Sequence, residues 1–475
     1  MSLVNFEVLN RKLVQLVQKA DMFECGDFHL LKFVQYAIHH AAADTRIYQR
    51  PLFMLPGAAG SLMAALRSVK HQAGVNERKQ LLMLQKGKNT LLIGGSNIIG
   101  LPDGTMVSAN TKNLLEVLGP EECVYIYNGS GRAPVDTGQD LNLDDINHLG
   151  SLMPMSRETR KLNRSLRKAI VRIRKSGLLT EKEMMHLAGQ LQNFSDAFSD
   201  WLFVLKHLRP SRVLFTPHYY NEGLIHAART MGIRTIELQH GLISEEDFYY
   251  VYPKEVGTFR QRALFADEIA VFGPYWKDVL LKGGEYSPEQ IRIIGRYQYH
   301  PPVTPEAKEA FFQKHNLGGK HVIAVSCQTN NPDYYANYTH QLAERLNREN
   351  PDWVIVLKPH PRQLGMDLLS ECTRHENVRL MDKTESLMTL LSVAEIQISI
   401  YSTTFFDAIG TDTVNLSLQD DAALSTYARS MIEAGVAAPL RDDENPVDVA
   451  NRVRETAVSL RGDYVYSPFD RSFFT

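Results

Sequence analysis

The second half of the chain most constrains the fold, because short apolar runs alternate there with amphipathic stretches of helical length. The first group of runs comprises SRVLFTP (211–217), IRTIELQHG (233–241), DEIAVFG (267–273) and IRIIGRY (291–297). Helices are expected at about 221–231 and from Tyr275. Strands that are buried on both faces and joined by helices form a parallel sheet. This group therefore predicts an α/β lobe.

A second group of apolar runs predicts another lobe of the same kind. Its members are HVIAVSC (321–327), WVIVLKPHPR (353–362), NVRLMD (377–382), EIQISIYSTT (395–404) and TVNLSL (413–418). Between the two groups lies the segment 296–309, where Pro301, Pro302 and Pro305 resist both helix and strand. We expect the hinge between the lobes in this segment.

The residues before 211 complete the first lobe and precede it with helices. Apolar positions recur at helical spacing up to about residue 85, and strand-like runs follow at 89–98 and 123–127. A chain of 475 residues is too long for one ordinary core. The predicted division is a helical N-terminal segment (1–85), a first Rossmann-like lobe (86–300) and a second Rossmann-like lobe (301–475).

Composition and charge constrain the partners and the cellular location expected for this chain. The formal net charge is -2, so no overall positive field attracts nucleic acid, and no nucleic-acid partner is expected. The N-terminal residues lack the basic start and long apolar run of a signal peptide, which predicts a cytoplasmic protein. The four cysteines are scattered, with no pair at the spacing of a zinc or redox site.

One segment concentrates positive charge. Residues 157–175 hold nine Lys or Arg against a single Glu, and Leu162, Leu166, Ile170 and Ile173 are spaced to form one apolar stripe. A basic amphipathic helix is predicted. It is either a solvated helix face or a platform for anionic lipid headgroups or an acidic, membrane-anchored acceptor. The second reading would place the protein at the inner face of the plasma membrane.

Polar side chains follow the strands of the first lobe, where ligands bind in open α/β sheets. We expect the acceptor side of the site here, with His218, Tyr219, Asn221 and Gln239 as candidates. His240 stands before a glycine that allows close substrate approach, and a histidine can act as a general base at neutral pH. Glu222 is the competing base, at the start of a helix.

The second lobe has two polar strand-end loops. In KPHPR, two prolines keep the backbone extended while it presents Lys358, His360 and Arg362 to an anion. In YSTTFFDA, hydroxyl side chains precede a predicted helix whose N-terminus favours a phosphate, and Asp407 lies one turn further on. The expected donor-binding residues are Lys358, His360, Arg362, Ser402, Thr403, Thr404 and Asp407.

These motifs resemble those of known families over roughly residues 210–420. His360-Pro361, followed by Ser402 and Thr403, looks like the HP and serine motifs of bacterial sialyltransferases and polysialyltransferases. In that family these motifs bind the cytidine nucleotide and its phosphate. The sequence QHG at 239–241, together with KPHPR, also looks like the motifs of wall teichoic acid glycerophosphate polymerases. Both resemblances imply the two-lobed GT-B architecture.

The resemblance implies a glycosyltransferase that uses a nucleotide-activated sugar, with a CMP-linked sugar such as sialic acid or Kdo favoured. The acceptor would be a capsule, lipopolysaccharide or other surface glycan or glycolipid. Cationic side chains and hydroxyls would neutralise the leaving phosphate, so no metal or cofactor is expected, and in-line attack would invert the anomeric carbon. His240, Glu222 and His360 are the expected catalytic residues. The alternatives are a cytidine-linked polyol-phosphate transferase, a sugar-nucleotide 2-epimerase and a non-catalytic glycan-binding protein.

Overall fold

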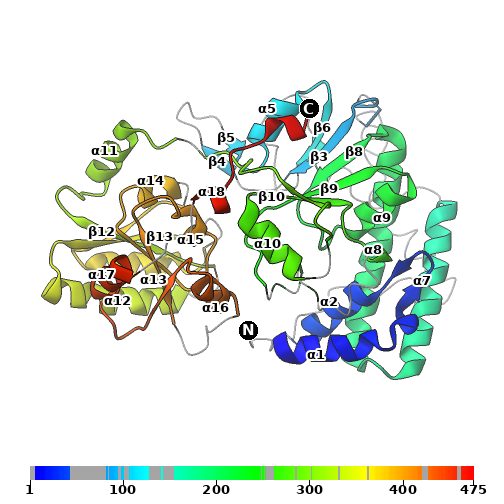
Figure 1. The fold of residues 1–475 in the computed structure, drawn as a ribbon, viewed down its shortest axis with the longest axis horizontal. Helices are drawn as coiled ribbons and strands as arrows, with labels where there is room; N and C mark the ends of the chain where they lie inside the picture. Colours follow the sequence, from blue (N-terminus) through cyan, green and yellow to red (C-terminus); the bar gives the residue numbers. More distant parts are fainter. Residues whose placement is uncertain are drawn as a thin grey trace.

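The structure is a computed structural model, and its α/β core is formed by two separate parallel sheets (Figure 1). Its described residues are 6–42, 82–83, 85–94, 98–100, 106–127, 141–142, 155–245, 247, 249–250, 252, 262–283, 286–300, 302–329, 332–360, 363–383, 385–419, 426–456 and 462–475.

The first sheet has seven parallel strands in the order β11-β10-β9-β8-β3-β6-β7. Their bounds are β3 Thr90–Gly94, β6 Cys123–Tyr127, β7 Leu141–Asn142, β8 Arg212–Phe215, β9 Arg234–Leu238, β10 Glu268–Val271 and β11 Ile291–Ile293. Along β3 all five residues are buried, as expected for a central strand covered on both faces. The runs predicted as strands are confirmed.

The second sheet has six parallel strands in the order β14-β13-β12-β15-β16-β17. Their bounds are β12 His321–Ser326, β13 Trp353–Lys358, β14 Val378–Leu380, β15 Ile396–Ser399, β16 Val414–Leu418 and β17 Ala438–Leu440. Apolar side chains pack in separate clusters around Ile355 and Val356, which are neighbours on β13 and point to opposite faces.

Strand order places the site in each lobe. The chain enters the first sheet at β3 and later returns beside it at β8, and it enters the second at β12 and returns beside it at β15. Ligands in doubly wound sheets bind beyond the carboxyl ends of the strands at such switch points. The loops after β8 and β15 therefore occupy the two switch points. Two Rossmann-like lobes confirm the predicted GT-B fold class.

Helices of the first lobe cover its sheet and carry the N-terminal segment. They are α5 Lys112–Leu118, α7 Arg157–Ser176, α8 Glu181–Leu208, α9 Glu222–Thr230 and α10 Pro274–Lys282. Thr180 and Glu183 form a capping box that fixes where α8 begins. The N-terminal helices α1 (Phe6–Val17) and α2 (Leu31–Ala42) are joined by the antiparallel strands β1 (Glu24–Cys25) and β2 (Phe28–His29). α2 packs against α8, so the N-terminal segment shares the first lobe's apolar core.

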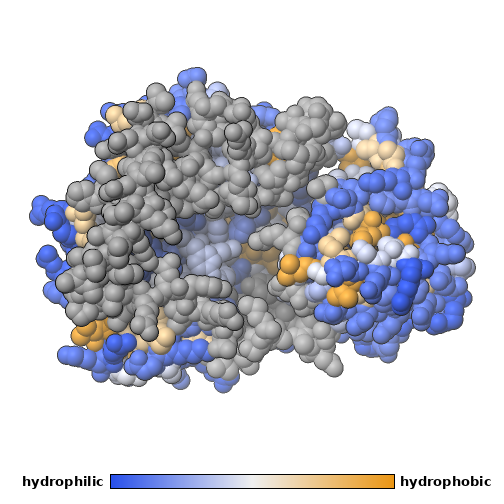
Figure 2. Space-filling model, turned by 180° about the vertical axis from the view of Figure 1, so that it is seen from behind, coloured by the Kyte–Doolittle hydropathy of each residue, from blue (hydrophilic) through white to orange (hydrophobic). Residues whose placement is uncertain are grey.

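The remaining elements belong mainly to the second lobe, whose visible surface is largely hydrophilic when the molecule is seen from behind (Figure 2). Its helices are α11 Pro305–Lys314, α12 Pro332–Glu349, α13 Met366–Glu371, α14 Leu387–Leu391, α15 Thr404–Asp407, α16 Thr426–Glu433 and α17 Pro446–Thr456. A small antiparallel pair, β4 (Ile98–Gly100) and β5 (Met106–Ser108), lies outside both main sheets. No described helix is long and apolar enough to cross a bilayer.

The expectation that Pro305 would resist a helix is wrong. Pro305 begins α11, and the side chain of Thr304 accepts a hydrogen bond from the backbone N–H of Ala307. Proline is favoured at the first helical position, because its missing N–H would have no partner there and its φ already suits the helix. Pro301 lies outside the described residues.

The C-terminal segment returns to the first lobe (Figure 1). After α18 (Gly462–Val465), the backbone N–H of Ser467 donates to the carbonyl of Phe272 at 2.9 Å, and Asp470 N–H donates to the carbonyl of Ile294 at 2.8 Å. The C-terminal residues from Ser467 to Asp470 therefore pack beside β10 and β11 of the first sheet, although the predicted division assigned them to the second lobe. The division at residues 85 and 300 stays a prediction.

Gly295 allows this close approach, and we predict that Gly295→Ala destabilises the protein by about 2–4 kcal/mol. Its φ is +76°, and an added Cβ would lie 2.0 Å from the carbonyl oxygen of Pro468. Gly319→Ala is the matched control, because φ there is +68° and nothing lies within 4 Å of an added Cβ. Denaturant unfolding should show the larger loss for Gly295→Ala, and equal losses would contradict the steric explanation.

Candidate active site

The strand-end loops of the two lobes face each other at Gly241 and Thr403. Gly241 follows β9, Thr403 follows β15, and a Cβ added at Gly241 would lie 4.0 Å from Cγ2 of Thr403. Parallel strands place their ligand-binding loops at the carboxyl edge, so both sheets present that edge to the same region. The polar motifs QHG and YSTT, far apart in the chain, are thereby brought together.

His240 is half-buried in this region. Its Nε2 lies 3.2 Å from the hydroxyl of Tyr219, while its Nδ1 is shielded from solvent and has no hydrogen-bond partner among the described residues. The amide of Gln298 donates to the backbone carbonyl of His240 at 3.2 Å and holds the loop. Burial lowers the pKa of His240 below its usual 6.5. A neutral imidazole with one nitrogen still unpaired is the state that a general base requires.

The side chain of Gln239 is engaged inside the first lobe. It is fully buried, its side-chain oxygen accepts from Phe272 N–H at 2.9 Å, and its amide donates to the carbonyl of Gly241 at 2.9 Å. The hydroxyl of Tyr297 donates to its backbone carbonyl at 2.8 Å. The expected contact of the Gln239 side chain with an acceptor is therefore not supported. The side chain fixes the turn that carries His240.

His218 is also buried, and both of its ring nitrogens are engaged. Nδ1 donates to the Glu237 carboxylate at 2.7 Å, and Nε2 donates to the carbonyl of Tyr249 at 2.8 Å. Both ring nitrogens therefore face oxygen atoms, and the ring is fixed beside the buried Glu237 carboxylate. A direct acceptor contact by His218 is not supported. Its place is beneath the loop that carries Tyr219.

Glu237 is the centre of this buried network. Besides the ring of His218, its carboxylate accepts from the His218 backbone N–H at 3.0 Å, the Tyr250 hydroxyl at 2.8 Å and the Tyr286 hydroxyl at 3.2 Å. Burial acts to raise the pKa of Glu237, but the charge and hydrogen bonds of His218 outweigh it, and the net pKa is lowered. The group is an anchor for the floor of the site.

Aromatic side chains form the wall beside His240. The rings of Tyr219 and Tyr249 stack with centroids 4.4 Å apart, and the hydroxyl of Tyr220 lies 3.0 Å from that of Tyr249. Tyr220 is 60% exposed and has a φ of +67°, an uncommon backbone conformation for a residue other than glycine. The predicted acceptor-side residue Tyr219 thus lies next to His240, in an aromatic cluster whose exposed member is Tyr220.

The two remaining first-lobe candidates stand at the start of α9. Asn221 donates to the carbonyl of Pro217 at 2.8 Å and makes no side-chain cap to the helix. Glu222 is buried and forms an ion pair with Lys32 at 2.9 Å. Burial lowers the pKa of Lys32, with Glu222 opposing that shift. The ammonium of Lys32 already occupies the Glu222 carboxylate, whereas Nδ1 of His240 has no partner among the described residues, so His240 is the better candidate.

The KPHPR loop is described only in part. Lys358 directs its amine at the backbone carbonyls of Asp382 and Lys383, at 3.3 and 2.8 Å. Burial lowers the pKa of Lys358. The backbone N–H of His360 donates to the side-chain oxygen of Gln363 at 3.3 Å. Arg362 and Pro361 lie outside the described residues, so the donor-binding roles of this loop stay predictions.

The YSTT loop precedes a helix that is shorter than expected. α15 has only four residues, its N-cap Thr403 makes no side-chain cap, and Ser402 Oγ accepts from Thr404 N–H at 3.3 Å. The hydroxyl of Thr404 is bonded to the amide of Gln397. The hydroxyls do not all precede the predicted helix, because that helix is one turn long and Thr404 is its first residue. Ser402 and exposed Thr403 remain candidate phosphate ligands.

Asp407 connects the lobes. Its carboxylate pairs with Arg296 at 2.5 Å and accepts from the Tyr466 hydroxyl at 3.3 Å. The guanidinium of Arg296 also lies over the ring of Tyr466, 4.4 Å from its centroid. The expected contact between Asp407 and a ribose stays a prediction without support, since the carboxylate already has two partners.

The segment that the sequence analysis treated only as a hinge places polar side chains beside the site. Arg296, Gln298 and His300 follow β11 and extend toward the lobe junction, where Gln298 also donates to Asn110 at 3.1 Å. The Nε2 atom of His300 is buried without a partner among the described residues, and burial lowers the pKa of His300 to about 4. Their position after the carboxyl end of a strand was the available signal.

Acidic side chains near the site are dispersed. Glu222, Glu237 and Asp407 each have basic partners, and the buried carboxyl of Asp247 has its pKa raised to about 7 by burial. Within the described part of the chain, no three His, Cys, Asp or Glu side chains are grouped as metal ligands would be.

Comparison with known proteins finds no matching family model and no matching curated protein. Among solved structures, the UDP-GlcNAc 2-epimerase of Neisseria meningitidis bound to UDP-GlcNAc is 15% identical, with 77% of this chain and 91% of that chain covered and a TM-score of 0.46. The S. aureus MnaA-UDP structure is 15% identical, with 81% and 94% covered and a TM-score of 0.48. A glycosyltransferase from Rickettsia africae is 10% identical, with 80% and 96% covered and a TM-score of 0.41. Likenesses this remote carry no argument about the reaction, and the two-lobed fold rests on this chain's own parallel sheets.

Proposed function

We propose that this protein is a GT-B glycosyltransferase that moves a sugar from a nucleotide-activated donor to a glycan or glycolipid acceptor. The observation that carries the proposal is the close approach of the two lobes, where a Cβ added at Gly241 would lie 4.0 Å from Cγ2 of Thr403. His240 stands next to this point, and its Nδ1 has no partner among the described residues. A base on one lobe and hydroxyls on the other match a transfer in which each lobe holds one substrate.

In the proposed reaction, an acceptor hydroxyl gives its proton to Nδ1 of His240 while its oxygen attacks the anomeric carbon of the donor. The bond from that carbon to the phosphate oxygen breaks, and its electron pair stays on the phosphate. Tyr219 supports this role, because its hydroxyl can accept the proton on Nε2 and leave Nδ1 free as the base. Attack from the face opposite the phosphate inverts the anomeric carbon.

On the donor side, Ser402, Thr403, His360 and Arg362 are proposed to bind the phosphate that leaves. Cations and hydroxyls aimed at the developing negative charge stabilise it most in the transition state. Lys358 is proposed to act indirectly, by positioning the loop at 382–383, because its amine donates to the backbone carbonyls of that loop. The HP and serine motifs favour a cytidine nucleotide.

The nucleotide can be tested by measuring the melting temperature of the protein with CMP, CDP, UDP and GDP in turn. A ligand that binds only the folded protein raises the melting temperature by mass action. CMP should give the largest rise. A rise only with UDP would replace the cytidine donor, and no rise with any nucleotide would contradict a nucleotide-sugar enzyme.

The reaction class is tested by following nucleotide release from CMP-, UDP- and GDP-linked sugars, with and without a surface-glycan acceptor. Release that depends on the acceptor, with the sugar recovered on it, supports the transferase. Sugar epimerised or freed without an acceptor would identify an epimerase. Transfer of a polyol phosphate from CDP-glycerol would identify the polymerase alternative, and nucleotide binding without turnover would identify a binding protein.

The lowered pKa of His240 predicts the pH profile of the reaction. The base works only when neutral, so log kcat/KM should stay level as the pH falls to 6.5 and decline only at lower pH. An acid limb centred at or above 6.5 would contradict the assignment. Replacement of solvent by D2O during the titration would shift the limb and identify it as a protonation step.

A further inference from the structure

The outer face of α7 combines charge and apolar surface in a way that the reaction does not use. The exposed basic residues that form a stripe along it are Arg157, Lys161, Arg164, Arg167, Lys168 and Lys175. Apart from the adjacent Arg167 and Lys168, neighbouring members are three, four or seven positions apart, so at 3.6 residues per turn they lie along one side of a helix about 30 Å long. The buried residues of α7, including Leu166 and Ile170, lie on the opposite face.

This basic stripe has few neutralising partners. Among the described residues no carboxylate lies within ion-pair distance of its six members, whereas neighbouring Arg174 pairs weakly with Glu181 at 3.6 Å. The single acid of the helix, Glu158, pairs with Lys206 of α8. Like charges at this spacing repel one another and destabilise a helix. A negatively charged partner would relieve that repulsion.

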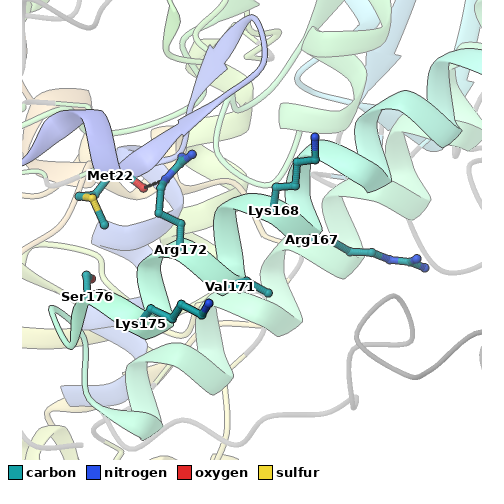
Figure 3. A pocket seen from close by; sticks show the side chains of 7 residues that line it. All are labelled: Met22, Arg167, Lys168, Val171, Arg172, Lys175 and Ser176. Atoms are coloured by element: carbon teal, nitrogen blue, oxygen red, sulfur yellow. Dashed lines mark hydrogen bonds between the residues drawn. The ribbon is translucent and has the colours of Figure 1, made fainter.

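The helix is nevertheless held firmly to the first lobe. Arg172, next to the stripe, turns inward and donates to the carbonyl of Met22 at 3.1 Å (Figure 3). It also donates to the carbonyl of Glu24. Leu162, Leu166 and Ile173 anchor the other face in the core. A rigid, outward-facing helix loses little conformational freedom when a partner covers it.

Apolar groups are placed within and beside the stripe. Val171 is 53% exposed and lies between the extended side chains of Arg167, Lys168 and Lys175 (Figure 3), in an open pocket of about 610 Å³. Met155, just before α7, and Met185, early in α8, are 51% and 52% exposed. A polyanionic glycan or a nucleic acid would gain nothing from these side chains. An anionic bilayer offers negative headgroups to the Lys and Arg side chains and an apolar region into which Val171 can insert.

We propose that the basic stripe of α7 docks the protein on the surface of an anionic lipid bilayer, with the exposed side chain of Val171 inserted at the headgroup boundary. α7 lies at the outer edge of the first lobe, away from the second sheet (Figure 1). Docking there leaves the strand-end loops of both lobes uncovered. The surface stands independently of the reaction proposed for the site.

The test is co-sedimentation of the whole protein with vesicles of phosphatidylcholine, alone or mixed with phosphatidylglycerol. Arg164→Glu with Arg167→Glu reverses two charges of the stripe. Arg348→Glu with Arg374→Glu is the matched control, because both arginines are exposed in the second lobe. Binding to the mixed vesicles should fall on the order of a hundredfold in the stripe variant and stay unchanged in the control. Thermal unfolding of both variants checks that each is folded.

A second variant separates insertion from charge attraction. Val171→Ser keeps every cation, so its vesicle binding should fall severalfold at high salt, where charge attraction is screened. Failure of the unaltered protein to bind the mixed vesicles would overturn the proposal. So would equal losses in the stripe and control variants, or binding to heparin in place of vesicles.

Discussion

His240→Ala should lower kcat/KM for sugar transfer by about 10²–10⁴, the usual contribution of a general base. The ring is neutral at pH 7 because burial lowers its pKa, and Nδ1 has no partner among the described residues. Alanine removes the proton acceptor and leaves the Gln239 strut that shapes the loop. Steady-state rates with a fixed donor and varied acceptor measure the loss.

The matched control is His321→Ala. That histidine has an exposed side chain and pairs with Glu395 on the surface of the second lobe, so the rate should not change. Both variants should bind the nucleotide as the unaltered protein does, because neither residue is assigned to the donor. A rate for His240→Ala within threefold of the control would remove His240 from the mechanism and leave Glu222 as the candidate base.

Glu237→Ala should destabilise the first lobe by about 3–5 kcal/mol, the typical cost of leaving one partner of a buried ion pair alone. The change would leave the buried ring of His218 without its carboxylate partner and would remove the oxygen that accepts from the hydroxyls of Tyr250 and Tyr286. The melting temperature should fall by several degrees or more, and denaturant unfolding should show an earlier transition.

Glu268→Ala is the control, since Glu268 lies on the neighbouring strand and its ion-pair partners among the described residues are half-exposed Arg234 and Arg292. A loss of about 1 kcal/mol or less is expected there, because exposed ion pairs contribute little. Glu237→Gln should be intermediate, as it keeps one acceptor oxygen but loses the charge. Equal losses for Glu237→Ala and Glu268→Ala would show that the buried network does not hold the floor of the site.

The strands could be predicted from the sequence because both sheets are buried on both faces. Runs such as WVIVLK have no reason to be continuously apolar unless helices cover both sides, and this pattern identified each main lobe. The basic helix could also be predicted from the sequence, because one apolar stripe opposite many cationic side chains fits only a helix at the surface. Proline was less informative: Pro305 starts a helix where a break was expected.

The side-chain roles within the site were harder to predict, because they depend on partners far away in the chain. Gln239 and His218 stand at strand ends like ligand-binding residues, yet Phe272 and Glu237 hold them in the interior. No local sequence pattern predicts these contacts between residues that are distant in the chain. Arg296 was passed over for the converse reason, because its partner Asp407 lies 111 positions later.

The return of residues 462–474 to β10 and β11 has a consequence for biosynthesis. Val465 and Phe474 are part of the first lobe's core, so that core is incomplete while the ribosome is still making the second lobe. At ordinary elongation rates this wait lasts roughly ten seconds or more. During that interval the unfinished lobe exposes apolar surface, and chaperone demand should be greatest then.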